Sequence, residues 1–168
     1  MFMKVNIALL TVTDTRTFDN DKSGAILVEK IKSANHNLID RKICKDNKDD
    51  IVIILKEWIK KDVIDVVITT GGTGLTGRDI TPEAIDQIAD KQIPGFGELF
   101  RNLSLKTVGT SAIQSRACAV LANGKYVFAL PGSSGGVTDA WEGILKHQLD
   151  VNHKPCNFVE LFPRLKEK

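Results

Sequence analysis

The sequence contains few cysteines, and the three present do not form a recognisable metal site or disulfide framework. Cys44, Cys118 and Cys156 are odd in number and far apart. They lack the close paired spacing that zinc sites and disulfide-rich domains show. We therefore expect reduced thiols, most of them packed in the core.

Long hydrophobic runs and an excess of one charge are also missing. The 23 basic and 21 acidic residues give a formal net charge of +2, too balanced and too evenly interspersed to favour nucleic acid or a membrane surface as a partner. The apolar stretch 5–12 is interrupted by Asn6 and Thr11 and lacks a small-residue cleavage site after it, so it predicts a buried strand rather than a signal peptide. No stretch approaches the length of a membrane-spanning helix. We expect a soluble, cytoplasmic protein.

The composition is that of an ordinary globular chain. Hydrophobic residues make up 42% of the 168 positions and charged residues 26%, close to the averages for soluble domains. A chain of this length buries about 70% of the surface that its unfolded form exposes. We therefore expect residues 1–168 to form a single domain.

Short β-branched runs alternate with segments of helical periodicity along the chain. This alternation predicts an α/β fold of three layers, with a mostly parallel central sheet and helices on both faces. Ser23 is expected to cap the first helix and Thr81 to cap the helix that begins at Pro82. Strands are expected at 5–13, 38–44, 63–69 and 125–130, and helices at about 23–34, 47–61, 82–89, 95–104 and 137–149.

Two segments are less regular. The composition of 112–121 allows a helix, but the Asn123-Gly124 step that follows it is typical of a two-residue hairpin turn and favours a strand. The tail from Pro155 onward looks irregular, with Phe158 and Phe162 available to dock it on the core.

A glycine-rich turn follows the third expected strand. Four glycines and three threonines fall within residues 70–77, which is more than a turn without a ligand requires. Glycines allow positive φ and carry no side chain, so a phosphate can approach their amides closely. Ligands of open parallel sheets bind at the carboxyl ends of the strands. We therefore expect Gly71, Gly72, Thr73 and Gly74 to cradle a phosphate.

Two familiar nucleotide-binding motifs fit this turn only in part. Gly72-x-Gly74-x-x-Gly77 has the letters of a dinucleotide fingerprint, but it follows the third strand and its helix starts only near Thr81. The spacing of Gly72 and Gly77 is that of a phosphate-binding P-loop, but Arg78-Asp79 stands where that loop requires a lysine and a hydroxyl residue. Neither interpretation is favoured.

Asp79 is the most informative residue after the turn. A carboxylate beside phosphate-binding amides repels a bare anion but is well suited to hold Mg²⁺ that bridges phosphate oxygens. The alternative is a simple turn or cap aspartate. Arg78 can either oppose a phosphate or remain solvated.

A second candidate anion site follows the last expected strand, at Pro131, Gly132, Ser133 and Ser134. It joins that strand to a helix, where free amides and hydroxyls favour phosphate. Two such loops at one sheet edge suggest a substrate with more than one phosphate or polar end. We recognise no covalent nucleophile motif, and His36, His147 and His153 are scattered. These features favour phosphoryl chemistry driven by positioning and charge neutralisation.

Taken together, these segments resemble the MoaB/MogA family of molybdenum cofactor biosynthesis, the molybdopterin adenylyltransferases. The likeness covers nearly the whole chain, and residues 104–110 and 155–158 look closer to the MoaB branch. It rests on an ordered series of segments: Leu10-Thr11-Val12-Thr13-Asp14, Asp21-Lys22-Ser23-Gly24, Thr69 to Gly74, Arg78 to Ala84, Gly95-Phe96-Gly97-Glu98, Gln114-Ser115-Arg116-Ala117 and Leu130-Pro131-Gly132-Ser133.

The resemblance implies a MogA-like molybdopterin-binding fold, a homo-oligomer that is a trimer or hexamer, and a Mg²⁺-dependent reaction of molybdopterin with ATP. The product is adenylylated molybdopterin, with release of pyrophosphate. Asp79 matches an essential aspartate of the family. Asp46 matches a second acidic position, for which Asp49 and Asp50 remain alternatives. Both Asp79 and Asp46 are expected to be catalytic and to hold the metal.

The motifs and the resemblance together also predict the substrate-binding residues. Ser115 and Ser133 are expected to contact pterin or phosphate. Thr13 stands where the family usually has serine and keeps the hydroxyl, whereas Gly135 lies near a position that is basic in some members. The full set of expected substrate-binding residues is Thr13, Ser23, Gly71, Gly72, Thr73, Gly74, Glu83, Ser115, Pro131, Gly132, Ser133 and Ser134.

Two rival functions remain open. The first is a non-catalytic molybdopterin-binding or carrier protein, since the MoaB branch includes members with an uncertain catalytic role. The second is a related nucleotide hydrolase. The presence of both Asp46 and Asp79 favours the adenylyltransferase.

Overall fold

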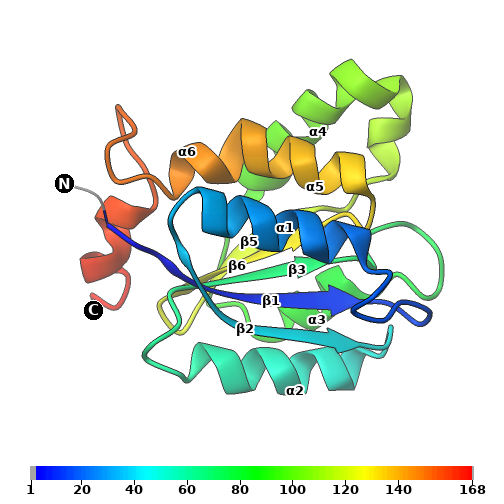
Figure 1. Cartoon of the computed structure of the whole chain (residues 1–168), viewed down its shortest axis with the longest axis horizontal. Helices are drawn as coiled ribbons and strands as arrows, with labels where there is room; N and C mark the ends of the chain where they lie inside the picture. Colours follow the sequence, from blue (N-terminus) through cyan, green and yellow to red (C-terminus); the bar gives the residue numbers. More distant parts are fainter. Residues whose placement is uncertain (1–2, 168) are drawn as a thin grey trace.

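The computed structural model describes residues 3–167 and shows a six-stranded sheet between two layers of helices (Figure 1). The strand order is β2-β1-β3-β6-β5-β4. The first four strands in this order run parallel, whereas β5 and β4 are antiparallel to their neighbours. The mostly parallel α/β fold is therefore confirmed. The strands are β1 (Asn6–Val12), β2 (Asn37–Cys44), β3 (Val66–Thr70), β4 (Lys91–Gln92), β5 (Cys118–Ala122) and β6 (Lys125–Leu130).

The helices divide between the two faces of the sheet (Figure 1). On one face lie α1 (Lys22–Ser33), α4 (Pro94–Val108), α5 (Ser134–Ala140) and α6 (Lys146–Gln148). A π-helical stretch, η2 (Trp141–Leu145), joins α5 to α6. Two 3₁₀ segments are also present: η1 (Gly109–Gln114) follows α4, and η3 (Val159–Arg164) lies near the C-terminus. On the other face lie α2 (Lys48–Ile59) and α3 (Thr81–Asp86).

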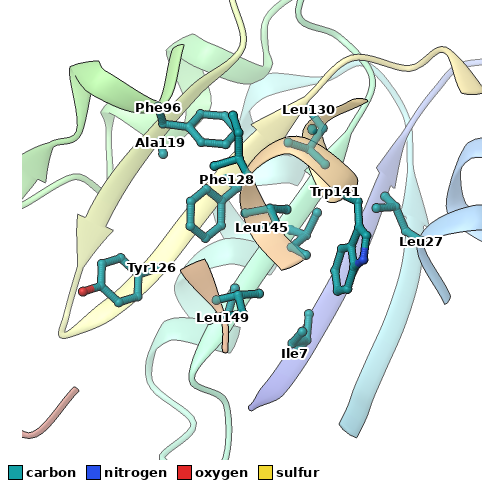
Figure 2. Packing of buried hydrophobic residues seen from close by; sticks show 14 of the residues in the cluster. Ile7, Leu27, Phe96, Ala119, Tyr126, Phe128, Leu130, Trp141, Leu145 and Leu149 are labelled. Atoms are coloured by element: carbon teal, nitrogen blue, oxygen red, sulfur yellow. The ribbon is translucent and has the colours of Figure 1, made fainter. Parts of the chain in front are cut away.

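The central strands are buried on both faces because helices cover both. In β1, Ile7 and Leu9 face the layer of α1 and α5, whereas Ala8 and Leu10 face α2. Successive side chains of a strand point to opposite faces, so a strand covered on both sides has a continuous apolar sequence. This explains the apolar stretch 5–12 near the N-terminus. Figure 2 shows Trp141 among the side chains that fill the core between the sheet and the layer of α1 and α5.

The predicted hairpin is confirmed. Cys118 to Ala122 pairs antiparallel with Lys125 to Leu130, and the turn residues Asn123 and Gly124 have φ of 49° and 71°. A two-residue hairpin turn of this kind requires positive φ at both central positions. The earlier part of the ambiguous segment, through Gln114, belongs to η1 instead.

Both helix-cap predictions are wrong, by two residues for α1 and by one residue for α3. Asp21 caps α1, because its carboxylate accepts the amide of Gly24 at 3.0 Å, and Ser23 already lies inside the helix. Thr81 is the first residue of α3, and its hydroxyl donates to the carbonyl oxygen of Gly71 at 2.8 Å. Thr81 therefore ties α3 to the glycine turn rather than capping the helix.

The C-terminal segment docks on the core as expected. The ring centroids of Phe158 and Phe162 lie 4.6 and 5.7 Å from that of Tyr126. The cysteines are free thiols, but Cys156 is exposed and the other two are half-buried, so the expected burial holds only in part. Between residues 3 and 167, no helix combines the length and hydropathy of a bilayer-spanning segment.

Candidate functional site

Two loops meet at the carboxyl edge of the sheet, because β3 and β6 are adjacent parallel strands. The amide of Gly71 donates to the carbonyl oxygen of Leu130 at 3.0 Å, and the Thr70 hydroxyl donates to that of Pro131 at 2.7 Å. A Cβ atom on Gly132 would lie 3.2 Å from Cα of Gly71. The two glycine-containing loops therefore pack directly against each other, and glycine allows the close approach.

A cavity of about 650 Å³ opens beside these loops. Its wall combines backbone and carboxylate groups from the loops with apolar and hydroxyl side chains from α4 and η1. Eight of the expected site residues line it: Gly72, Thr73, Gly74, Asp79, Ser115, Pro131, Gly132 and Ser133. The remaining lining residues are Phe100, Ser104, Thr107, Val108, Ser111, Ala112, Gln114, Gly135, Gly136 and Asp139.

Three predicted substrate-binding residues, Gly71, Thr13 and Ser134, lie outside the cavity wall. The amide of Gly71 is already donated to Leu130. Thr13 Oγ1 lies 3.3 Å from the amides of Thr15 and Arg16, which donate to it. Ser134 is exposed at the first position of α5. This arrangement therefore does not favour contact between these three residues and the substrate.

Ser23 and Glu83 are occupied by arginines instead of lining the cavity. The Ser23 hydroxyl is buried, accepts Nη1 of Arg16 at 2.9 Å and lies 3.2 Å from Asp21. Glu83 is exposed and forms an ion pair with Arg116. Each residue acts on a loop through its arginine: Arg16 also donates to the carbonyl oxygen of Gly132 at 2.9 Å.

Arg116 holds the glycine turn in place, a role that sequence reasoning missed. Its Nε donates to the carbonyl oxygen of Gly74 at 2.7 Å and its Nη2 to that of Asp79 at 2.6 Å. Its own amide donates to the carbonyl oxygen of Thr73 at 2.9 Å. One residue from the segment before β5 thus binds three carbonyl oxygens between Thr73 and Asp79, two through its side chain and one through its amide.

Asp46 and Asp79 both face the glycine turn. A Cβ atom built on Gly72 would lie 3.1 Å from Oδ1 of Asp46, and one built on Gly74 would lie 2.8 Å from Oδ2 of Asp79. A side chain at Gly74 would therefore collide with Asp79, whereas one at Gly72 would press on Asp46 and collide with Oγ1 of Thr81, 2.4 Å away. The alternatives for the first acid, Asp49 and Asp50, lie in the first turn of α2, where their amides donate to Asn47.

Asp14 and Arg78 complete the charge arrangement around these carboxylates. Arg78 donates through Nε and Nη2 to both oxygens of Asp14, at 2.8–3.0 Å. Asp14 also accepts the amide of Asp46 at 3.2 Å. Arg78 is therefore the ion-pair partner of Asp14 in the loop after β1 and is not simply solvated.

The pKa values of Asp46 and Asp79 are shifted in opposite directions. Burial raises the pKa of Asp46, the negative charges of Asp14 and Asp79 raise it further, and Arg78 opposes them. Burial also acts to raise the pKa of Asp79, but hydrogen bonds from the Thr76 hydroxyl and amide outweigh it and leave that pKa lowered. Asp79 is thus held as a carboxylate, whereas protonation of Asp46 is the easier of the two.

The donor set fits Mg²⁺ that is shared with phosphate. Mg²⁺ prefers oxygen ligands and is commonly held by one or two carboxylates together with substrate phosphates and waters. Asp46 and Asp79 supply such carboxylates beside the turn. Within residues 3–167, no group of three or more histidine, cysteine, aspartate or glutamate side chains is arranged to hold a metal unaided. Substrate phosphates and water would have to supply the other ligands of a Mg²⁺ ion here.

Comparison with known families decides the relationship. A family model described as a probable molybdopterin binding domain matches residues 8–151. The chain belongs to this family. Its place is among the proteins of molybdenum cofactor biosynthesis, as the sequence motifs predicted.

Individual relatives carry the name of the B branch. Molybdenum cofactor biosynthesis protein B of Escherichia coli (strain K12) is 43% identical over 166 residues, which cover 99% of this chain and 96% of the relative. A crystal structure of a molybdenum cofactor biosynthesis protein B is 38% identical, covers 99% of this chain and 98% of that chain, and superposes with a TM-score of 0.88. The tungsten cofactor synthesizing protein MoaB from Pyrococcus furiosus is 37% identical, with 86% and 92% coverage and a TM-score of 0.77. Both the MoaB/MogA relationship and the closer likeness to MoaB are confirmed.

Proposed function

We propose that the protein transfers AMP from ATP to molybdopterin in a Mg²⁺-dependent reaction. The observation that carries the proposal is the meeting of two phosphate-suited loops at one cavity, with Asp46 and Asp79 facing the glycine turn. A binding site for the pterin alone has no evident use for two carboxylates beside a phosphate loop. A reaction that brings two phosphates together under a divalent cation uses both.

In this reaction an oxygen of the terminal phosphate of molybdopterin attacks the α-phosphorus of ATP. The new P–O bond forms as the bond from the α-phosphorus to the α,β-bridging oxygen breaks, and pyrophosphate leaves with that electron pair. The attacking phosphate is already an anion, so no protein base is required. The half-buried thiols do not compete as nucleophiles, since burial raises the pKa of Cys44 to about 12 and that of Cys118 to about 11.

The protein contributes positioning and charge compensation. When bound, Mg²⁺ neutralises the phosphate charge that the transfer concentrates at one point. Asp46 and Asp79 hold the cation beside the turn, and Gly72 to Gly74 leave room for the phosphates. Ser115 and Ser133, both on the cavity wall, orient the pterin phosphate. We place the reaction in the cytoplasm, where free thiols such as exposed Cys156 persist.

Product analysis tests the proposal. Incubation with molybdopterin and MgATP is expected to yield adenylylated molybdopterin, detected by mass spectrometry. Molybdopterin that binds tightly and is recovered unchanged would select the carrier function instead. Cleavage of ATP without molybdopterin would select the nucleotide hydrolase.

Removal of Arg78 is expected to shift the pH dependence of metal binding. A metal-binding Asp46 must be deprotonated, so affinity falls as the pH drops through its raised pKa. Arg78 lowers that pKa, so Arg78→Gln moves the acid limb to higher pH. Titration of Mn²⁺ as a Mg²⁺ substitute, in the presence of ATP and across pH, measures the midpoint. Arg164→Gln, which removes the remote ion pair with Glu167, is the control. An unchanged midpoint in Arg78→Gln would remove Asp46 from the metal site.

We also propose that the protein is a homo-oligomer, trimeric or hexameric, that associates through α4 and η1. These segments extend beyond the other helices (green, Figure 1). Leu105, Val108 and Ile113 expose 53%, 54% and 82% of their surfaces there. A shallow apolar depression between Leu105 and Ile113 lies on the same surface. Exposed apolar surface of this kind commonly marks a protein interface.

A charge at this surface is expected to dissociate the oligomer. Ile113→Glu places a carboxylate at the most exposed of these apolar positions and would leave it desolvated in an interface. Light scattering coupled to size-exclusion chromatography is expected to show a lower mass for this variant. Ile53→Glu on α2, where isoleucine is 65% exposed, is the matched control and should keep the wild-type mass. Equal masses for the two variants would place the interface elsewhere.

A further inference from the structure

Only two carboxylate side chains line the cavity among residues 3–167, and they stand in different surroundings. Asp79 is held by Thr76 and faces the glycine turn, where the phosphates and the cation are proposed to lie. Asp139 belongs to α5 and has no part in that arrangement. Its carboxylate therefore calls for a separate explanation.

Asp139 lies one helical turn beyond the second phosphate loop. The wall of the cavity passes from Gly132 to Gly135 and Gly136 in the first turn of α5, and Asp139 follows one turn later on the same helix. Residues three or four apart lie on the same face of a helix. Asp139 thus extends the wall from the second loop toward α4.

Thr107 of α4 orients this carboxylate. Its Oγ1 lies 3.1 Å from Oδ2 of Asp139 and also 3.1 Å from the carbonyl oxygen of Ser104. The single hydroxyl proton can be donated to only one of them at a time. At least one oxygen of Asp139 keeps its full acceptor capacity. No lysine or arginine belongs to the described cavity lining, so the carboxylate has no cationic partner within the cavity.

The neighbouring wall is apolar. Phe100, Val108 and Ala112 line the cavity beside Thr107. An apolar wall with one carboxylate at its edge fits a flat heteroaromatic ring that carries N–H donors on its rim.

A pterin ring has this property. Its pyrimidine edge presents the 2-amino group and N3–H as two adjacent, parallel donors. A carboxylate accepts such a pair with its two oxygens, in the geometry that makes guanidinium–carboxylate pairs specific. In a ring with oxygen in place of the 2-amino group, the same edge presents one donor flanked by two carbonyl acceptors, and these acceptors repel a carboxylate.

We propose that Asp139 is the specificity-determining residue for the pterin ring, that it accepts the 2-amino and N3–H donors, and that Thr107 positions it. This inference rests on the proposed function, since it takes molybdopterin as the ligand of the cavity. It adds a polar contact between α4 and α5, one helical turn beyond the second phosphate loop. The pterin is thereby fixed at both ends.

Pterin and lumazine, the 2-oxo analogue, are the probes, and calorimetry or ring fluorescence measures their binding. The wild type is expected to prefer pterin by about 10- to 100-fold, the discrimination typical of one good bidentate pair. Asp139→Asn replaces one acceptor with a donor, so pterin binds more weakly, lumazine binds more tightly, and the preference falls to within about threefold. Thr107→Val keeps the carboxylate but loses its orienting hydroxyl, and an intermediate preference is expected.

The control is Asp86→Asn, which alters an exposed carboxylate of α3 that bonds Gln92 outside the cavity. It should keep the wild-type preference, and unchanged unfolding temperatures should accompany all variants. An Asp139→Asn preference equal to that of wild type would overturn the proposal, as would a wild type that does not discriminate. These probes bind without turnover. A preference for pterin that depends on Asp139 could therefore be observed even if the protein did not transfer AMP, so each proposal can fail without the other.

Discussion

Asp79→Asn is expected to slow pyrophosphate release in the presence of molybdopterin and MgATP by about 10²- to 10³-fold, the usual cost of losing one preorganised electrostatic group. The carboxylate has a lowered pKa and is held by Thr76. Asparagine keeps the shape of the side chain but removes the charge that holds the cation. The residue is half-buried and lies in a loop, so thermal unfolding should change little.

Asp46→Asn should act in the same way, and Asp49→Asn is its matched control. The carboxylate of Asp46 approaches Gly72, whereas Asp49 lies at the start of α2 and exposes its side chain. The double variant Asp46→Asn/Asp79→Asn should lose little more than either single variant, because the two residues act on one cation. A defect in Asp49→Asn with a normal Asp46→Asn would reverse the assignment.

The largest expected loss of stability follows from Asp21→Ala. The Asp21 side chain is fully buried and accepts the Thr11 hydroxyl at 2.6 Å, the Gly24 amide at 3.0 Å and Nη2 of Arg41 at 2.9 Å. Its removal ends the cap of α1 and leaves Arg41 without its charge partner. Breaking a buried ion pair by removing one member costs about 3–5 kcal/mol. Chemical denaturation is expected to show this loss, while Asp19→Ala, an exposed position of the same loop, should be near neutral.

The contribution of Asp21 also depends on pH in a defined direction. Burial acts to raise its pKa, but the bonds from Thr11, Gly24 and Arg41 outweigh it and leave the pKa below the usual value of 3.8. A lowered folded-state pKa gives stability that is fully present above the unfolded pKa and lost as the pH falls through the folded one. The difference in unfolding free energy between wild type and Asp21→Ala should therefore shrink below about pH 4. A difference that grows on acidification would mean that the carboxylate is not the stabilising form.

Local patterns predicted most of the fold because local chemistry determines it. The apolar runs predicted the buried parallel strands. The Asn123-Gly124 step predicted the hairpin, because both residues readily adopt the positive φ values found there. The two-residue edge strand β4 was not predicted, because a strand that short has no periodicity. The cap of α1 was misplaced because Asp21 and Ser23 are both good capping residues, and the buried bonds of Asp21 to Gly24 and Arg41 decide between them.

The candidate site was predicted where it is contiguous in sequence. The glycine turn and the loop at Pro131 to Ser133 were identified from their own letters and line the cavity. The groups that position them are distant in sequence: Arg16 contacts the carbonyl oxygen of Gly132 across 116 positions, and Arg116 contacts that of Gly74 across 42. Contacts of this kind leave no local signal, and the contact between Thr107 and Asp139, 32 positions apart, was not predicted for the same reason.

Pyrophosphate release from MgATP, measured with and without molybdopterin, is the most direct test of adenylyl transfer by this protein. Release is expected to require molybdopterin, to match the adenylylated product one to one, and to be suppressed in Asp79→Asn. Release at the wild-type rate by Asp79→Asn, or no release by the wild type when molybdopterin is bound, would contradict the proposal.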